Sequence, residues 1–412
     1  MAQSLKVRQI KEMTHDATYQ REIQFRSSYP GRFPEISSEN WNSHTWQLKN
    51  SLKTLPQLEK HLTLSEEERA GLLLTGTKLA TAITPHFFNL LHATDPSDPI
   101  RRQIIPRIEE SLTDPTEMSD PCGEDSHMPV PGLVHRYPDR VLFLVTDRCA
   151  SYCRYCTRSR VVSGVSDQKL ETQWEAAFEY LAKTPSVRDV LLSGGDPLLL
   201  SDNRLDKILT RLREIPHIQF VRIGSRIPIF LPQRITPELC TMLEKHHPLF
   251  ISIHTNHPRE LTTEVRDGLI RLSKAGIQLG NQSVLLRGVN DSLPVHAALL
   301  HKLLMCRVKP YYLYQCDLIQ GSSHLRTAVQ TGLDLIEQLR GHTTGYAIPQ
   351  YVLDAPGGGG KIPLNPDYVV SRTKEKVVVR NYEGKQFAYP EIDHTPVTST
   401  HYDNEEKDLS FT

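Results

Sequence analysis

Residues 140–156 read RVLFLVTDRCASYCRYC, in which an apolar, β-branched run is followed at once by three cysteines spaced C-x3-C-x2-C. Short apolar runs of this kind are typical of buried strands in a parallel sheet. The cysteines, Cys149, Cys153 and Cys156, therefore fall on the loop that leaves the carboxyl end of a strand. If more strands of this kind follow, their carboxyl ends gather at one edge of a sheet, where catalytic groups collect in α/β folds.

The same pattern repeats along the rest of the chain. Strand-like runs follow at residues 187–194, 218–225, 249–255, 278–286, 309–315 and 346–354. Helical stretches lie between them or follow them, at 173–183, 204–215, 237–247, 264–276, 296–306 and 332–342. Regular alternation of strand and helix predicts parallel strands joined by right-handed crossovers. We therefore expect an α/β fold, either a barrel-like or an open sheet.

The chain divides into three regions by pattern. Residues 1–133 carry helical patterns interrupted by clusters of Pro and Asp, and residues 134–361 hold the alternating strands and helices. Residues 362–412 read as a small β-meander, with a turn at Glu383-Gly384, followed by a polar tail. We expect a mainly helical N-terminal region, one α/β domain and a small C-terminal β extension.

Composition limits the classes of partner. Lys and Arg together number 48, equal to Asp and Glu together, in a chain of 412 residues, so no basic surface is expected to attract nucleic acid. The sequence has neither an apolar leader nor a run of roughly 18 apolar residues that a membrane helix needs. Its seven cysteines, an odd number without a secretion signal, indicate reduced thiols. We expect a soluble cytoplasmic protein with a small-molecule partner.

Unusual polar or glycine-rich sequence stands at the expected carboxyl ends of six strands. Besides the cysteine loop, these segments are SGGDP (193–197), IGSR (223–226), HTNHP (254–258), YQCD (314–317) and LDAPGGGGK (353–361). Folding alone does not require such residues at one edge of a sheet. We interpret this edge as the rim of an active site.

The three cysteines favour an iron–sulfur cluster. A structural zinc site usually closes with four ligands from paired C-x2-C arms, and the chain has no second C-x2-C pair. Three thiolates on a short loop suit a [4Fe–4S] cluster whose fourth iron has no protein ligand. Zinc binding and three ordinary cysteines remain as alternatives.

The segment APGGGGKIP (355–363) is the second distinctive motif. It is not a phosphate-binding P-loop, because Ala355 stands where that motif needs Gly and Ile362 where it needs Ser or Thr. Four glycines let the backbone pass close to a ligand, and the following Lys361 suits a Schiff base if its amine is held unprotonated. The alternative is a flexible linker that ends in a solvated lysine.

The cysteine spacing, with Tyr155 before the last cysteine, resembles the radical S-adenosylmethionine enzymes. The resemblance implies that S-adenosylmethionine chelates the open iron and that one electron cleaves it to methionine and a 5'-deoxyadenosyl radical. It also implies that the glycine-rich segment receives the methionine amino group, with expected contacts from Tyr155, Ser193, Gly194, Gly195, Asp196 and Gln282. An ordinary strand-to-helix turn is the alternative for that segment.

Longer stretches are similar to the lysine 2,3-aminomutase family. They lie at 193–202, 221–239, 279–291, 308–318, 339–349 and 353–361. The similarity extends from about Trp41 to about Tyr389. It implies a partial (β/α)6 barrel and an isomerase that moves the α-amino group of L-lysine to the β-carbon. The implied cofactors are a [4Fe–4S] cluster, S-adenosylmethionine and pyridoxal 5'-phosphate.

The resemblance also assigns residues to roles. Lys361 matches the lysine that binds pyridoxal phosphate, and Arg158 matches the arginine that pairs with the substrate carboxylate. Asp317 and Asp354 match the two aspartates that bind the ε-ammonium group. Glutamate-specific members have Lys and Asn at these two positions, so we expect a cationic substrate. Arginine or another cationic amino acid remains an alternative, since a guanidinium also pairs with carboxylates.

Other residues are weaker candidates. Arg136, Tyr137 and Arg140, just before the first strand of the α/β region, are expected to bind the phosphate of pyridoxal phosphate, and an ordinary salt bridge is equally compatible. The sequence gives no reason to single out Cys122.

Some family members bind zinc through a C-terminal cysteine cluster. This chain has Ser292 where they have another cysteine, and no cysteine after Cys316, so we expect no C-terminal zinc site. By analogy we expect a homo-oligomer that takes electrons from a donor such as flavodoxin or ferredoxin. The rival hypotheses are a related radical enzyme with another substrate and a non-catalytic iron–sulfur or zinc protein.

Overall fold

A nine-stranded sheet forms the centre of the computed structural model, which describes residues 13–74, 79–112, 114–162, 170 and 173–392. The strands lie in chain order, β1 (Leu133–Tyr137), β2 (Arg140–Thr146), β3 (Asp189–Gly194), β4 (Phe220–Ser225), β5 (Leu249–Ile253), β6 (Gln278–Leu285), β7 (Lys309–Gln315), β8 (Gln350–Ala355) and β9 (Gly360–Leu364). Strands β2 to β8 are parallel. Strands β1 and β9 pair antiparallel at the two edges.

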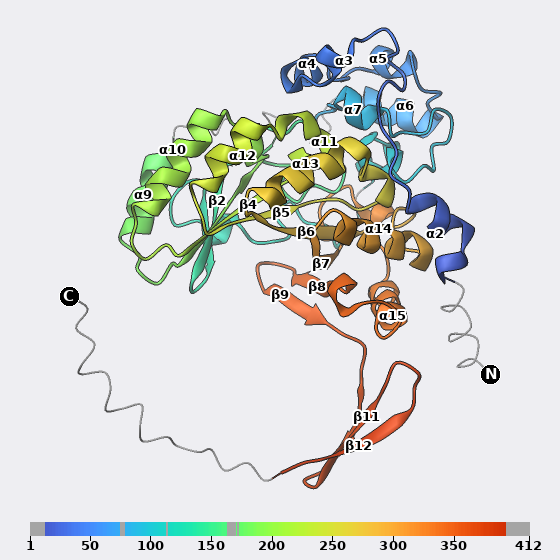
Figure 1. Cartoon of the computed structure of the whole chain (residues 1–412), viewed down its shortest axis with the longest axis vertical. Coiled ribbons are helices and arrows are strands. Elements are labelled where there is room, and N and C mark those ends of the chain that lie inside the picture. The colour runs from blue at the N-terminus through green and yellow to red at the C-terminus, as the bar shows by residue number, and fades with distance from the viewer. Residues whose placement is uncertain (1–12, 75–78, 113, 163–169, 171–172, 393–412) are drawn as a thin grey trace.

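Six helices connect or follow the parallel strands and cover the outside of the sheet (Figure 1). They are α9 (Trp174–Ala182), α10 (Asp202–Arg213), α12 (Pro237–Glu244), α13 (Thr263–Lys274), α14 (Leu293–Met305) and α15 (Val329–Leu339). The seven strand-like runs of the sequence correspond to β2 to β8. The α/β, barrel-like fold is therefore confirmed, with antiparallel edge strands added to it.

Amphipathic spacing explains how these helices pack. In α10 the buried residues are Leu205, Ile208, Leu209 and Leu212, at the i, i+3, i+4, i+7 spacing that puts side chains on one helical face. This face packs into the same core cluster as strand residues such as Val190. Thr262 begins α13 by accepting a hydrogen bond from the Val265 N–H, which satisfies an otherwise unpaired donor at the helix N-terminus.

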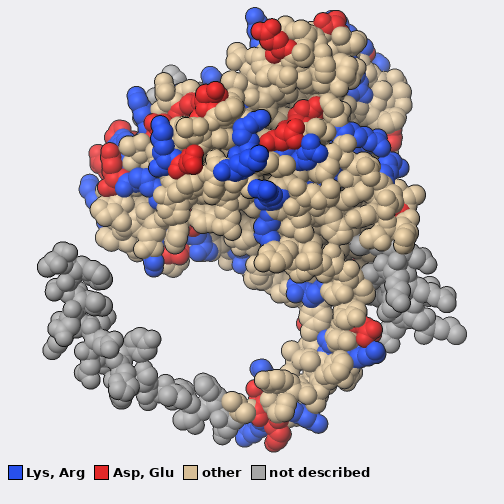
Figure 2. Space-filling model, in the orientation of Figure 1, with Lys and Arg blue, Asp and Glu red and all other residues tan. Residues whose placement is uncertain are grey.

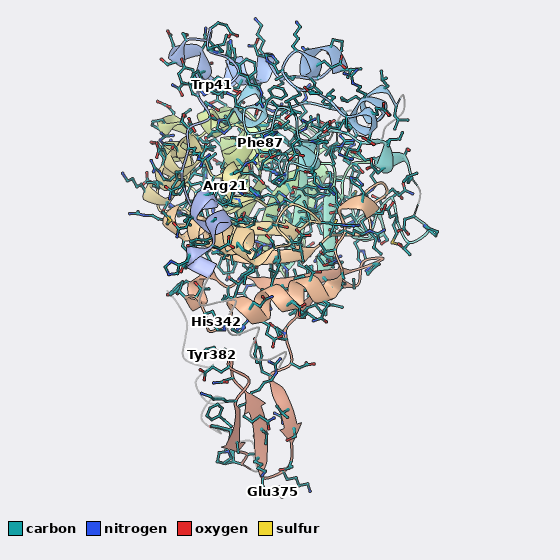
Figure 3. The ribbon with its side chains drawn as sticks, turned by 90° about the vertical axis from the view of Figure 1, so that its right-hand side faces the viewer. Arg21, Trp41, Phe87, His342, Glu375 and Tyr382 are labelled. Carbon is teal, nitrogen blue, oxygen red and sulfur yellow. The ribbon has the colours of Figure 1, made fainter. Side chains whose placement is uncertain are left out.

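Short helices of the N-terminal region pack against the α/β region; the first of them contacts α14, and others contribute to the main core. They are α2 (Ala17–Glu22), α3 (Ser38–Trp41), α4 (His44–Lys49), α5 (Leu55–Glu59), α6 (Glu66–Leu73), α7 (Pro85–Phe88) and α8 (Arg101–Ile104). Phe87 of α7 packs edge-on against Phe230, with ring centroids 4.6 Å apart. Figure 3 shows Trp41 near the outer end of this region and Phe87 closer to the barrel. The N-terminal helices are thus joined to the α/β region by a continuous apolar core.

A separate three-stranded sheet projects from the body of the molecule (Figure 1). Its strands are β10 (Val369–Arg372), β11 (Lys376–Arg380) and β12 (Gln386–Pro390), all antiparallel. Tyr382, between β11 and β12, contacts His342 edge-on at 5.1 Å between ring centroids, where the small sheet meets the body (Figure 3). These strands lie in the segment for which the sequence predicts a β-meander, and the predicted tail after it lies outside the described residues.

Charges of both signs occur on the visible face of the molecule. Figure 2 shows Lys and Arg side chains interspersed with Asp and Glu on the visible face of the barrel, in agreement with the equal counts of the sequence. Within the described ranges, no helix has both the length and the apolar character needed to span a bilayer.

Candidate active site

The cysteine loop follows β2, and the N-terminal region anchors it. The Arg154 N–H donates to the Gln103 carbonyl oxygen at 2.9 Å, and the Arg154 guanidinium bonds the Glu110 carboxylate, with Nε 2.9 Å from Oε1. The same guanidinium donates to the carbonyls of Leu79 and Ala80. The loop that holds the three cysteines is therefore fixed by segments far earlier in the chain.

The three thiols are free and lie close enough to influence one another. Burial, followed by the charge of Cys156, raises the pKa of Cys149 well above its ordinary value. Burial and the charge of Cys153 raise the pKa of Cys156 to about 11. Such a site disfavours thiolates unless a cation neutralises them, and that is what a metal centre provides.

Another group of side chains has ligand atoms close enough together to hold a single cation. Among the residues that the structure describes, the group of three metal-capable side chains whose ligand atoms all lie within 4.8 Å of one another is Cys122, Asp317 and Asp354. The three loop cysteines do not form such a group.

Behind the loop lies a buried polar network that centres on Tyr155. Its hydroxyl accepts a hydrogen bond from Asn256 Nδ2 at 2.6 Å and bonds His254 Nε2 at 2.8 Å. Arg226 Nη1 also donates to this hydroxyl, and it donates to Cys153 Sγ at 2.7 Å. Burial lowers the pKa of His254 well below its ordinary value, so this ring is neutral. The backbone of Gln282, on β6, hydrogen-bonds the same ring.

The glycines of SGGD allow two chain segments to approach closely. A side chain at Gly194, whose φ is 128°, would put its Cβ 2.1 Å from the Thr146 carbonyl oxygen, and one at Gly195 would lie 2.1 Å from the Arg148 oxygen. The Gly195 N–H donates to the Thr146 oxygen at 2.6 Å. Only glycine fits here, and the glycine-rich segment is thereby held against the start of the cysteine loop.

Asp196, the last residue of SGGD, uses its carboxylate to organise the turn after β4. Its Oδ2 accepts from the N–H groups of Arg226 at 2.6 Å and Ile227 at 3.0 Å, and its Oδ1 accepts from Ser225 Oγ at 2.7 Å. Burial raises the pKa of Asp196 to about 6 in spite of these bonds. These bonds place the Arg226 backbone beside the glycine-rich segment.

Arg158 lies between the cysteine loop and the glycine-rich segment. Its Nε and Nη2 bond the carboxylate of Glu124 at 3.0 and 2.7 Å, and its Nη1 donates to Ser193 Oγ at 3.1 Å. Glu124 is buried and was not predicted from the sequence. The bidentate pair fixes the plane of the guanidinium and leaves its Nη1 edge toward Ser193.

Lys361 lies on the β8–β9 hairpin, directly opposite Asp354. Its Nζ is 2.7 Å from Asp354 Oδ2, and Arg136 Nη2 donates to the other oxygen, Oδ1, at 3.0 Å. The Lys361 N–H donates to the Tyr137 hydroxyl at 3.0 Å. In the turn of the hairpin, Gly357, Gly358 and Gly360 have φ values of 74°, 91° and 89°, a conformation that side chains disfavour.

Arg136 of β1 and Arg140 of β2 both contact Tyr137, whose hydroxyl accepts the hydrogen bond of the Lys361 N–H. Arg140 lies 4.0 Å from the Tyr137 ring centroid and pairs with Asp139. Burial raises the pKa of Tyr137, but hydrogen bonds from Lys361 and Arg136 outweigh it, so the pKa lies below its ordinary value. A lysine flanked by two arginines and a tyrosine fits a phosphate-bearing aldehyde cofactor.

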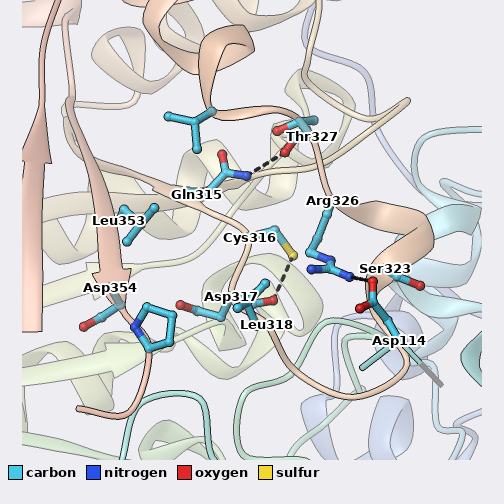
Figure 4. A pocket seen from close by; sticks show the side chains of 12 residues that line it. Asp114, Gln315, Cys316, Asp317, Leu318, Ser323, Arg326, Thr327, Leu353 and Asp354 are labelled. Atoms are coloured by element: carbon cyan, nitrogen blue, oxygen red, sulfur yellow. Dashed lines mark hydrogen bonds and ion pairs between the residues drawn. The ribbon is translucent and has the colours of Figure 1, made fainter. Parts of the chain in front are cut away.

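A pocket of about 430 Å³ opens at the carboxyl ends of β7 and β8 (Figure 4). Asp317 and Asp354 lie at one end of it, and Arg326 pairs with Asp114 at the other. Burial, followed by the charge of Asp354, raises the pKa of Asp317 to about 7. Two neighbouring carboxylates in a half-buried pocket favour a bound cation.

Cys122 is a site residue that the sequence did not predict. Its sulfur lies within 4.8 Å of carboxylate oxygens of both Asp317 and Asp354, and burial raises its pKa above the ordinary value. Its carbonyl oxygen accepts a hydrogen bond from Arg136 at 2.9 Å. A neutral thiol beside a carboxylate that already has two cationic partners suits an organic cation better than a metal ion.

The predicted residues thus come together in two neighbouring groups. The first, at the carboxyl ends of β2 to β4, holds the cysteines, SGGD and Tyr155, and Gln282 joins it from within β6 through His254. The second, on β1, β7, β8 and β9, holds Arg136, Tyr137, Asp317, Asp354 and Lys361. Arg158 and Glu124 lie between the cysteines and SGGD, and the charge of Arg158 acts on Asp317. A radical generator and an amino-acid pocket can therefore share one edge of the sheet.

Comparison with known proteins agrees with this geometry. Residues 143–300 match the radical SAM superfamily, which defines the class of this α/β fold and its three-cysteine loop. Residues 336–410 match the family described as lysine-2,3-aminomutase. The chain belongs to the lysine 2,3-aminomutase family. Membership implies an iron–sulfur cluster, S-adenosylmethionine and pyridoxal phosphate, and the residues described above fit these groups.

Relatives resemble most of the chain. L-lysine 2,3-aminomutase of Fusobacterium nucleatum is 52% identical over 90% of this chain and 88% of its own length, and that of Clostridium subterminale is 50% identical over 88% of each. Glutamate 2,3-aminomutase of Clostridioides difficile is 42% identical over 85% of this chain and 82% of its own. Among solved structures, coproporphyrinogen III oxidase of Escherichia coli has a TM-score of 0.36 at 15% identity, over 49% of this chain and 52% of that one.

Proposed function

We propose that this protein is an L-lysine 2,3-aminomutase, an isomerase that interconverts L-lysine and β-lysine. The observation that carries the proposal is the pair of carboxylates, Asp317 and Asp354, in the pocket beside Lys361. Sequence identity of 50–52% with two L-lysine 2,3-aminomutases over most of the chain supports it.

Each cofactor has a proposed set of residues. Cys149, Cys153 and Cys156 hold a [4Fe–4S] cluster, and Lys361 binds pyridoxal phosphate, with Arg136, Tyr137 and Arg140 around it. When bound, the cluster and S-adenosylmethionine supply an alkyl radical strong enough to abstract hydrogen from C3, and pyridoxal phosphate supplies the π bond through which nitrogen migrates to C3. The protein positions the reactants and excludes solvent.

The pocket recognises a primary ammonium group. Burying an ammonium costs several kcal/mol unless it is paired and hydrogen-bonded, and the two carboxylates provide that pairing. The ε-ammonium of Lys361, 2.7 Å from Asp354 Oδ2, is itself an example of the group that this carboxylate accepts. A glutamate side chain would bring a third carboxylate beside Asp317 and Asp354, so we infer that glutamate is excluded by repulsion.

The opposite end of the substrate is assigned to Arg158. Glu124 fixes the guanidinium through Nε and Nη2, so the Nη1 edge beside Ser193 is the one that can reach a carboxylate. The substrate is then held by charge pairs at both of its ends. The carbon chain between them is thereby positioned relative to the radical source.

We also infer a one-electron donor of the flavodoxin or ferredoxin type and a homo-oligomeric state. Phe387 and Tyr389 of the projecting sheet are 53% and 70% exposed, and exposed aromatic side chains of this kind support self-association. Measurement of molar mass in solution tests the second point.

An anaerobic competition assay tests the proposed function. The reconstituted protein receives S-adenosylmethionine, pyridoxal phosphate and dithionite with equal concentrations of lysine, arginine and glutamate, and products are identified by mass spectrometry. We expect β-lysine from the parent protein and strongly reduced β-lysine from Asp317→Asn. β-Arginine as the main product would show that arginine is the preferred substrate. Failure to form any β-amino acid, with an intact cluster, would contradict the proposal.

A further inference from the structure

Arg226 is a buried arginine that contacts a proposed cluster ligand. It follows β4 directly, and its side chain is 6% exposed. Nη1 donates to Cys153 Sγ at 2.7 Å, the sulfur of the middle cysteine of the loop. The two residues are 73 positions apart in the chain, so the contact arises from the fold.

Other groups leave the Arg226 guanidinium little freedom to move. Nη2 donates to Gln103 Oε1 at 2.8 Å and to Glu260 Oε2 at 2.9 Å. The cation lies 4.4 Å from the centroid of the Phe230 ring, within range of a cation–π interaction. Asp196 holds the Arg226 backbone N–H. The four hydrogens on the terminal nitrogens thus all have acceptors, counting the Tyr155 hydroxyl.

A hydrogen bond to a ligand sulfur changes the stability of a cluster's two redox states unequally. One-electron reduction from [4Fe–4S]2+ to [4Fe–4S]1+ adds negative charge that spreads onto the sulfurs, so a donor at the sulfur stabilises the reduced state. A fully buried carboxylate nearby acts in the opposite direction. Glu260 is 0% exposed and bonds the same guanidinium, so it moderates the effect of Arg226.

We propose that Arg226 is a positioning residue of the iron–sulfur centre, which orients the Cys153 sulfur and raises the reduction potential of the cluster, and that Glu260 limits this rise. The inference rests on the proposed cluster and goes beyond the proposed reaction. The segment SGGD would then also influence the reduction potential of the cluster, because its Asp196 fixes the backbone of Arg226.

The test is a redox titration of the reconstituted protein, with dithionite as the one-electron donor and the reduced cluster followed by electron paramagnetic resonance. Arg226→Lys keeps a positive charge beside Glu260. An ammonium lacks the forked donors of a guanidinium, so it cannot bond Glu260 and Cys153 at the same time. We expect the ratio of reduced to oxidised cluster at a fixed potential to fall about tenfold, which corresponds to about 59 mV for one electron. Glu260→Gln should raise this ratio.

Arg234→Lys is the matched control. Arg234 is also a buried arginine, with Asp202 and the Leu200 carbonyl as partners, and none of these residues belongs to the cysteine loop. The reduction potential of the cluster in Arg234→Lys should equal that in the parent protein. Iron content and circular dichroism verify that each variant is folded and loaded. If Arg226→Lys does not load, a ratio in Glu260→Gln that is unchanged or lower than in the parent would still overturn the inference.

The outcomes separate this inference from the proposed function. An unchanged potential in Arg226→Lys, or shifts of Arg226→Lys and Glu260→Gln in the same direction, would overturn the role of Arg226 and leave the aminomutase proposal standing. A parent protein that assembles no [4Fe–4S] cluster under these conditions would overturn both. Shifts in opposite directions, with Arg234→Lys unchanged, would support the inference, because general loosening of the fold does not produce opposite signs.

Discussion

Asp354 and Lys361 face each other across the β8–β9 hairpin, with Lys361 Nζ 2.7 Å from Asp354 Oδ2. Arg136 of β1 bonds the other carboxylate oxygen at 3.0 Å. One carboxylate therefore connects the proposed cofactor lysine, the proposed phosphate-binding residues and the pocket for the substrate ammonium. The position of each of these groups depends on that hairpin.

The first prediction concerns Lys361. In Lys361→Ala, the visible absorbance that pyridoxal phosphate acquires when bound covalently to a lysine should disappear, and β-lysine formation should fall below detection. Lys385→Ala is the control, because Lys385 pairs with Glu383 on the projecting sheet. Normal absorbance in Lys361→Ala would assign the covalent lysine elsewhere.

The second prediction is a pH dependence of substrate capture. Burial and the charge of Asp354 raise the pKa of Asp317 to about 7, and only the ionised carboxylate attracts an ammonium. We expect kcat/KM for lysine to rise as the pH increases from about 6 to about 8, reporting the free enzyme. Asp317→Asn should lose this rise and have a low kcat/KM throughout. A profile in Asp317→Asn identical to that of the parent would exclude Asp317 as the titrating group.

The third prediction concerns how the raised pKa of Asp317 affects the stability of the folded protein. A carboxyl whose pKa rises from 3.8 in the unfolded chain to about 7 in the folded protein binds more protons when folded, so its ionisation removes stability as the pH rises through that interval. Without substrate, Asp317→Asn should therefore be more stable than the parent at pH 8, by a melting-temperature increase of about 2 °C or more. At about pH 3, below both pKa values, the difference should nearly vanish. Scanning calorimetry at the two pH values measures it.

The fourth prediction concerns Arg158. A lysine at this position cannot bond Glu124 bidentately and also direct a second donor toward Ser193. Arg158→Lys should lower kcat/KM for lysine about 100-fold, a loss of about 3 kcal/mol. For lysinamide, which has no carboxylate, kcat/KM should differ little between the parent and the variant. Equal sensitivity to both substrates would contradict a contact with the carboxylate.

The fifth prediction tests a close contact under the pocket. A Cβ at Gly332 of α15 would lie 2.3 Å from Tyr351 Cζ, and the Tyr351 hydroxyl donates to Gln315, which lines the pocket. Gly332→Ala should destabilise the protein by about 1–3 kcal/mol through overpacking. Gly345→Ala, whose added methyl group would have no neighbouring atom within 4 Å, should leave the melting temperature nearly unchanged. An equal loss of stability in both variants would contradict overpacking against Tyr351.

Periodicity predicted the parallel part of the fold because each strand carries its own apolar run. The edge strands carry a weaker signal. Residues 360–364 follow a glycine-rich turn and are mostly exposed, so β9 becomes a strand only by pairing with β8. Strand β1 likewise forms by pairing with β2. Its five residues mix apolar and polar side chains, so their pattern alone does not predict a strand.

The site was predictable where a motif carries it. The cysteines, SGGD and the glycine-rich lysine segment stand in short stretches with distinctive spacing. Glu124 and Cys122 had no such signal, because their partners are distant in sequence; Arg158 and Glu124, for example, are 34 positions apart. Arg226 stands in the strand-end segment IGSR, but its contact with Cys153 could not be predicted from that segment. Only the folded arrangement makes an ordinary Glu or Cys part of the site.

The most direct measurement of the central claim is isotope transfer during turnover of lysine labelled with 15N on the α-amino group. We expect β-lysine with the label retained on the β-amino group, even when unlabelled ammonia is present in excess, because the nitrogen migrates within one molecule. Formation of β-lysine without the label, or formation of 5'-deoxyadenosine without any β-lysine, would contradict the assignment of this protein as a lysine 2,3-aminomutase.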